Sequence, residues 1–93
     1  MSELDGEWDV RRVSGLLPPL YGVRKRIEGA NGETTLGPLH SPFDVVGRDL
    51  RYRGLATRGL VDSVEPDGDE WSGVARYRGR VIGRFAMRRT MSR

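Results

Sequence analysis

Five glycine-containing turn signals divide most of this chain into short runs in which polar and apolar residues alternate. They are Asn31-Gly32, Gly47-Arg48, Thr57-Arg58-Gly59, Asp67-Gly68 and Tyr77-Arg78-Gly79. Loops of two or three residues with this composition are typical of β-hairpins, because glycine and asparagine accept the positive φ angles that such turns need. A chain divided in this way is expected to fold as consecutive antiparallel strands.

Each turn also sets a strand register. The predicted opposite pairs are Ile27 with Leu36, Val45 with Leu50, Phe43 with Tyr52, Gly54 with Asp62, Tyr52 with Val64, Val64 with Trp71, Leu60 with Ala75, Ala75 with Val81, and Trp71 with Phe85. A slip of one residue would turn a strand's apolar set to the opposite face. Because all five turns agree, they predict one continuous inner face. It comprises Val23, Lys25, Ile27, Leu36, Phe43, Val45, Leu50, Tyr52, Gly54, Leu60, Asp62, Val64, Trp71, Gly73, Ala75, Val81, Gly83, Phe85 and Met87.

The N-terminal part of the chain supplies the remaining elements. Alternation predicts a first strand over residues 6–13, with Trp8, Val10 and Arg12 on one side. The proline pair in 14–20 predicts a loop, and alternation resumes over 21–29. We expect an all-β, eight-stranded antiparallel up-and-down meander barrel, one domain over 1–93, in which the first strand pairs with the last. A two-sheet sandwich is the alternative.

Composition limits the class of protein. The 93 residues include 37% hydrophobic residues, no cysteine and a net charge of +3, and no apolar run is long enough to span a bilayer. The N-terminus lacks the pattern of a signal peptide, so we expect a cytoplasmic protein. The basic balance permits nucleic acid or an anionic membrane as partner. Acidic residues alternate with basic ones along the chain, however, which favours a soluble surface that binds neither.

The motif Gly6-Glu7-Trp8 opens the first strand, and Arg88-Arg89 lies on the last. With these residues on an eight-stranded meander, the chain resembles a much shortened member of the lipocalin or calycin group. The resemblance implies that Trp8 closes the barrel floor and that an arginine of the last strand, Arg89 or alternatively Arg88, stacks across it. It also implies that the barrel binds a small hydrophobic ligand and has no catalytic activity.

Two features bear on a ligand site inside the barrel. Leu16, Leu17 and Leu20 lie in the apolar loop and would line the barrel entrance, or else plug it or form an oligomer contact. The small inward residues leave space for a cavity, or allow the strands to bend; they are Gly54, Gly73, Ala75 and Gly83. A ligand-binding barrel is expected to hold a cavity above roughly 300 Å³, and a filled structural barrel is not.

Lys25 and Asp62 are the charged residues on the predicted inner face. An isolated charge there would be unfavourable by several kcal/mol. They could form a mutual ion pair; Lys25, with Tyr52 or Arg12, could receive a ligand carboxylate; or the register could place one of them in water. The aromatic residues Trp71 and Phe85 complete the predicted ligand-binding set of Leu16, Leu17, Leu20, Lys25, Tyr52, Asp62, Trp71 and Phe85.

Catalytic and metal sites are not expected. His40 is the sole histidine and lies in a proline-flanked turn, where a surface position is more typical than an axial haem ligand. No nucleophile, base and acid arrangement can be assembled from the sequence. The acidic stretch Asp67-Gly68-Asp69-Glu70 is explained by its turn and lacks the calcium-loop spacing. We therefore expect no enzyme activity, no cofactor and no metal.

The outer face of the last two predicted strands offers an interaction surface. Its apolar residues Val74, Ile82 and Ala86 are set among Arg76, Arg80, Arg84 and Arg88. An apolar strip rimmed by arginine suits a homodimer interface. An arginine stripe can also bind single-stranded nucleic acid, but that mode needs exposed aromatic rings, and the aromatic residues here mostly point inward or lie in turns. A possible homodimer is therefore the favoured partner.

Overall fold

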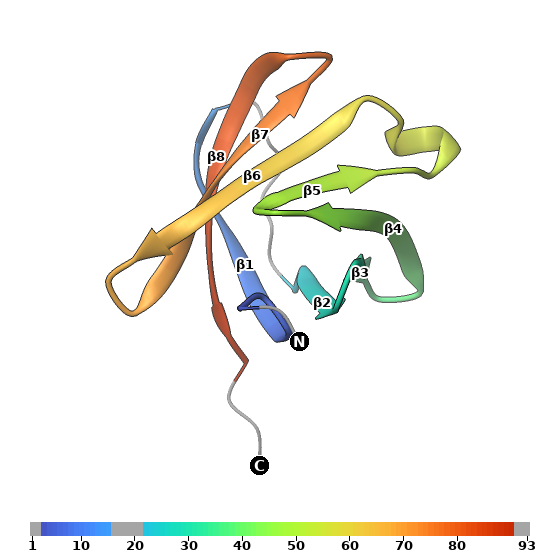
Figure 1. Cartoon of the computed structure of the whole chain (residues 1–93). Coiled ribbons are helices and arrows are strands. Elements are labelled where there is room, and N and C mark those ends of the chain that lie inside the picture. Colours follow the sequence, from blue (N-terminus) through green and yellow to red (C-terminus); the bar gives the residue numbers. More distant parts are fainter. Residues whose placement is uncertain (1–2, 16–21, 91–93) are drawn as a thin grey trace.

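The chain forms a closed barrel of eight antiparallel strands that follow one another in sequence order (Figure 1). The computed structural model describes residues 3–15 and 22–90. The strands are β1 (Gly6–Gly15), β2 (Arg24–Glu28), β3 (Asn31–Leu36), β4 (Leu39–Val46), β5 (Asp49–Tyr52), β6 (Leu60–Asp67), β7 (Glu70–Tyr77) and β8 (Arg80–Arg89). A single 3-10 turn, η1 (Leu55–Thr57), is the only helical segment in these ranges. It follows that they contain no helix long and apolar enough to cross a membrane.

Strand β1 closes the barrel because it pairs on both sides. Trp8 lies opposite Lys25 of β2 and opposite Arg89 of β8. The remaining strands each pair with their sequence neighbours, so the sheet has no free edge. The predicted up-and-down barrel is therefore confirmed, and the sandwich alternative is wrong.

Successive connections of the meander lie at alternate ends of the barrel, because neighbouring strands run in opposite directions. We call one end the floor end; it carries the connections 28–31, 46–49 and 67–70. The other is the mouth end; the connections there that the structure describes in full are 36–39, 52–60 and 77–80. In Figure 1 the turn between β6 and β7 lies at the lower left, and η1 lies at the upper right.

One predicted turn is confirmed in full, and four are displaced. The Gly47-Arg48 turn pairs Val45 with Leu50 and Phe43 with Tyr52, as expected. Elsewhere the pairs differ: Ile27 lies opposite Gly32 and not Leu36, Asp62 opposite Leu50 and not Gly54, Val64 opposite Gly73 and not Trp71, and Trp71 opposite Met87 and not Phe85. Each partner differs by two or four positions. An even displacement keeps the same side chains inward, so the predicted inner face largely survives.

Three of the four displaced registers have a local cause in the observed connections. Gly29, at φ 61°, replaces Asn31-Gly32 as the source of positive φ in the turn between β2 and β3. The connection after β5 is lengthened by η1. The last hairpin turns at Arg78 and Gly79, both at positive φ, and β8 then contains a bulge opposite Ala75 and Arg76. A bulge adds one unpaired residue and changes the register beyond it.

Two residues of the predicted inner face lie at strand ends and are exposed. Leu36 precedes the turn between β3 and β4, and Val81 lies beside the bulge in β8. Their predicted inward positions are wrong, because the pairing that would have covered them ends or shifts there. Ile82, predicted on the outer face, is partly buried against the core for the same reason.

Aromatic rings fill space that inward glycines leave. A Cβ atom built on Gly73 would lie 2.1 Å from the Phe85 ring, and one on Gly32 would lie 2.5 Å from the Phe43 ring. Real Cβ contacts are never so short, so each ring packs directly on the glycine backbone. These glycines therefore admit aromatic side chains to the core and do not themselves leave a cavity.

We predict that Gly73→Ala destabilises the barrel by about 1–3 kcal/mol, because the added methyl group displaces the Phe85 ring. Gly54→Ala is the matched control. Its Cβ would meet Thr57 Oγ1 at 3.3 Å and Pro42 Cδ at 3.8 Å, and its φ of −70° suits alanine, so stability should stay within about 1 kcal/mol of wild type. The free energy of unfolding in urea measures both. Equal losses would contradict the ring-on-glycine packing.

Candidate functional site

Four polar side chains from four strands meet inside the barrel. Lys25 of β2 donates hydrogen bonds from Nζ to Thr34 Oγ1 of β3 at 2.8 Å and to Tyr52 OH of β5 at 2.6 Å. A third bond reaches Asp62 Oδ2 of β6 at 3.0 Å. The alternation of each strand turns these side chains inward, and the pairing of Lys25 with Thr34 places them side by side.

The protons of this network can be assigned from donor counts. Lys25 has three N–H donors and uses all of them on the three oxygens. The single Tyr52 proton is donated to Asp62 Oδ2 at 3.2 Å. Thr34 then donates its proton to Tyr52 OH, which accepts from both Lys25 and Thr34. Every proton has one acceptor, so the Lys25 ammonium has no donor left for a ligand carboxylate.

The ion pair between Lys25 and Asp62 is buried, with residue exposures of 3% and 4%. A buried charge of either sign is tolerated only with a close partner and further hydrogen bonds. Both conditions are met here, so the mutual ion pair is the correct one of the three alternatives. Lys25 Nζ also lies 5.5, 5.2 and 5.4 Å from the ring centroids of Phe43, Tyr52 and Phe85, within cation–π distance.

Burial and neighbouring charges act together on the protonation of the network. Burial alone would lower the pKa of Lys25, but Asp62 and Tyr52 outweigh it and hold that pKa above its ordinary value. Burial raises the pKa of Tyr52, an effect that the neighbouring Lys25 opposes without cancelling. Lys25 is therefore charged and Tyr52 neutral, which is the state that the proton assignment requires.

The network forms part of the wall of an interior cavity of about 220 Å³. The lining is mostly apolar and comprises Val10, Val23, Lys25, Thr34, Ser41, Tyr52, Thr57, Leu60, Asp62, Ala75 and Phe85. Thr57 and Leu60 belong to the connection after β5, so the cavity extends toward the mouth end. Its volume is below the roughly 300 Å³ expected for a drug-sized ligand.

One oxygen in the cavity wall has spare capacity. The hydrogen bonds to Asp62 from Lys25 and Tyr52 both end on Oδ2. Within 3–15 and 22–90, no hydrogen bond reaches Asp62 Oδ1, and no fully buried side-chain oxygen there lacks a partner. Oδ1 is therefore partly accessible. A carboxylate oxygen in that position can accept a hydrogen bond from a molecule in the cavity.

The predicted ligand-binding residues divide into three groups. Lys25, Tyr52, Asp62 and Phe85 line the cavity. Trp71 does not line it; its ring packs edge-on against Trp8, with centroids 6.0 Å apart. The loop residues Leu16, Leu17 and Leu20 lie outside the described part of the chain.

Sequence reasoning missed Thr34. The predicted turn at Asn31-Gly32 places Pro38 opposite Lys25, whereas the observed turn places Thr34 there. A correct choice of Gly29 as the turn residue would have brought Thr34 beside Lys25.

The floor end is closed by a cationic side chain stacked on an aromatic ring. The Arg89 guanidinium lies 4.3 Å from the centroid of the Trp8 ring, and Trp8 itself is 1% exposed. The same guanidinium donates hydrogen bonds to the backbone oxygens of Asp5 at 2.5 Å and Glu3 at 2.9 Å. Trp8 Nε1 donates to Leu4 O at 2.9 Å. Arg89, and not Arg88, therefore occupies the position expected for the arginine across the floor tryptophan.

The other polar candidates lie apart from the cavity. His40 is exposed on β4, with Nδ1 3.2 Å from Glu33 Oε2. Over residues 3–15 and 22–90, no group of three acidic or histidine side chains could hold a metal ion. Neither His40 nor the acidic turn before β7 faces the interior site.

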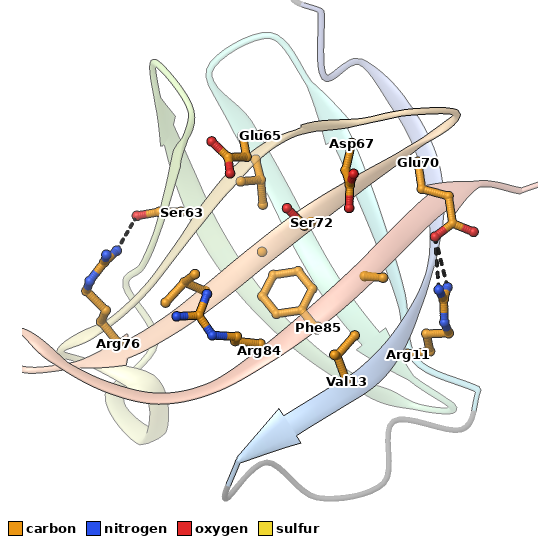
Figure 2. A pocket seen from close by; sticks show the side chains of 14 residues that line it. Arg11, Val13, Ser63, Glu65, Asp67, Glu70, Ser72, Arg76, Arg84 and Phe85 are labelled. Carbon is orange, nitrogen blue, oxygen red and sulfur yellow. Dashed lines mark hydrogen bonds and ion pairs between the residues drawn. The ribbon is translucent and has the colours of Figure 1, made fainter.

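The outer face of β6, β7, β8 and β1 forms a second concavity, of about 500 Å³ (Figure 2). Val74, Ala86, Arg76 and Arg84 of the predicted homodimer strip line it. Its edges are fixed by ion pairing and hydrogen bonding, because Arg11 lies 3.0 Å from Glu70 and Arg76 donates to Ser63 at 2.8 Å (Figure 2).

Comparison of the chain with protein-family models, with curated proteins and with solved structures found no significant match.

We predict that Asp62→Ala lowers the free energy of unfolding by about 3–5 kcal/mol, because it leaves the Lys25 charge buried without a partner. Asp44→Ala is the matched control. Asp44 pairs with Arg53 at 2.9 Å, a distance similar to that of the buried pair, but both side chains are about half exposed, so the loss should be about 0–1 kcal/mol. Urea unfolding distinguishes the two. A loss below about 1 kcal/mol for Asp62→Ala would contradict the buried pair.

We also predict that stability falls as the pH rises above about 10. The pKa values of Lys25 and Tyr52 are both higher in the folded than in the unfolded chain, so the unfolded chain loses these protons first. The two groups contribute fully to the free energy of unfolding at pH values below their pKa values in the unfolded chain, and this contribution declines at higher pH. Urea unfolding at neutral and alkaline pH should show a smaller decline for Tyr52→Phe than for wild type. An equal decline would contradict the raised pKa of Tyr52.

Proposed function

We propose that this protein is a lipocalin-like, non-catalytic binding protein that holds a small, mainly apolar molecule in its interior cavity. The observation that carries the proposal is the cavity of about 220 Å³, apolar over most of its wall, with Asp62 Oδ1 available on one side. The Arg89 stack on Trp8 supports the lipocalin-like interpretation, since that resemblance implies such a closure of the floor.

The cavity volume limits the size of the ligand. A dry cavity of about 150 Å³ in another protein accepts benzene. A volume of about 220 Å³ therefore suits a single ring, or an aliphatic chain of similar size, with a short substituent. Long-chain fatty acids and haem would require more space than this cavity offers.

The polar wall limits the chemistry of the ligand. Lys25 has used its three donors, so a carboxylate would find no hydrogen bond from it, and the Asp62 charge would repel it. A neutral ligand with one hydroxyl or amide N–H could donate to Asp62 Oδ1 while its apolar part packs on Val10, Val23 and Ala75. We therefore propose a small alcohol, phenol or amide in preference to a fatty or aromatic acid.

A second candidate function is a filled barrel that acts through its outer surface as a homodimer. The cavity volume favours it, because 220 Å³ lies below the size typical of ligand pockets. The concavity over β7 and β8, which Val74, Ala86 and Arg84 line, would be the contact. The proposed cytoplasmic location is common to both candidates.

Calorimetric titration with benzyl alcohol tests the first candidate, with benzoate as the charged comparison. We expect saturable binding of benzyl alcohol and weaker or no binding of benzoate. Ala75→Leu should abolish binding, because Ala75 lines the cavity and a larger side chain fills it.

Ala86→Leu is the matched control for this experiment. Ala86 lines the outer concavity, so the same enlargement there should leave binding of benzyl alcohol unchanged. Absence of binding to the wild type, or equal binding by Ala75→Leu, would reject the interior site. A dimer in analytical ultracentrifugation that Ala86→Leu dissociates, together with no binding, would select the second candidate.

A further inference from the structure

The topology sorts the charges of this chain to opposite ends of the barrel. The three mouth-end connections that the structure describes in full, 36–39, 52–60 and 77–80, contain four arginines and no acidic residue. The three floor-end connections, 28–31, 46–49 and 67–70, contain five acidic residues and one arginine. Successive connections lie at opposite ends of the barrel, so the two kinds of connection are separated. These mouth-end connections therefore carry positive charge and the floor-end connections negative charge.

The mouth-end arginines are mostly free of acidic partners. Arg53 pairs with Asp44 at 2.9 Å. Arg58, Arg78 and Arg80 form no ion pair with any acidic residue in the described ranges, and Arg78 lies over the Tyr77 ring. Their charges are therefore available to an external anion.

Exposed apolar side chains occupy the same end. Leu36 and Leu39 flank the turn between β3 and β4, Leu55 lies on η1, and Tyr77 precedes the last turn. Leu55 is 89% exposed and Leu39 67% exposed. At the floor-end connections, Val46 is the sole large apolar residue among those described that is exposed. Large aliphatic side chains in water beside unpaired cations mark a contact surface.

We propose that the mouth end docks onto the surface of an anionic lipid bilayer. The three connections would present Leu36, Leu39 and Leu55 to the interfacial region, while Arg58, Arg78 and Arg80 contact lipid phosphates. Binding of this kind combines buried apolar area with attraction to anionic lipids. Single-stranded nucleic acid fits less well, because it needs a series of stacking rings and the connections at this end expose aliphatic side chains with Tyr77 as their aromatic residue.

This proposal rests on the surface and not on the interior ligand, but the cavity and the proposed docking surface lie toward the same end of the barrel. Thr57 and Leu60, which line the cavity, belong to the same mouth-end connection as Leu55. A barrel docked in this way would hold its cavity next to the bilayer, where small apolar molecules concentrate.

Sedimentation with vesicles tests the proposal, using phosphatidylcholine alone and phosphatidylcholine mixed with phosphatidylglycerol. We expect binding to the mixed vesicles only, and a loss of binding when salt is raised to about 0.5 M, since screening weakens the attraction. The double variant Arg58→Glu with Arg80→Glu should reduce the partition constant for the mixed vesicles at least roughly 30-fold, given the contribution of each arginine near a membrane surface.

The matched control is Arg84→Glu with Arg88→Glu, which changes the net charge equally but on the outer face of β8, away from the mouth-end connections. We expect it to retain binding. In the same way Leu55→Ser should weaken binding and Val46→Ser should not. Circular dichroism confirms that each variant is folded.

Three results would overturn the proposal. They are equal losses in the two charge-reversed doubles, no binding of the wild type to mixed vesicles, and binding to a single-stranded oligonucleotide without binding to vesicles.

Discussion

The buried charge of Lys25 is the constraint on which the interior of this barrel depends. An ammonium group inside a small core must have an anion and acceptors within hydrogen-bonding distance. Thr34, Tyr52 and Asp62 provide them from β3, β5 and β6. A slip of one residue in any of these strands would turn its polar side chain to the outer face and leave the charge uncompensated. The hydrogen-bond network around this charge therefore links the registers of β2, β3, β5 and β6.

Much of the fold could be predicted from the sequence because the hairpin turns and the period-2 alternation agree. The Gly47-Arg48 turn gave the observed pairs, and the other turns erred by even displacements that kept most of the inward set, Leu36 and Val81 excepted. The errors arose where the sequence offers two alternative positions for a turn. Gly29 and Asn31-Gly32 are both suited to positive φ, but only Gly29 adopts it, while Gly32 lies in β3 with the Phe43 ring packed on it. Bulges and a 3-10 turn leave little trace in a single sequence.

The candidate site was predictable in its charged residues but not in its volume. Lys25 and Asp62 are conspicuous in an apolar face, and their pairing follows from the penalty of burying either alone. The cavity is smaller than the inward glycines suggest, because Phe85 and Phe43 occupy the space over Gly73 and Gly32. What remains is a single-ring volume beside the ion pair. Ring placement depends on three-dimensional packing, which alternation alone does not specify.

The pairing of β1 with β8 has a consequence for how the barrel is made. Trp8 and Arg89 lie on neighbouring strands although nearly the whole chain separates them, so their contact forms against a large loop-closure entropy. During synthesis β1 leaves the ribosome first and has only β2 as a neighbour until β8 follows. In that interval β1 and β7 each present an unpaired edge, and the Trp8 ring lacks its cover. Newly made chains are therefore most exposed to mispairing with one another just before the last strand closes the circle.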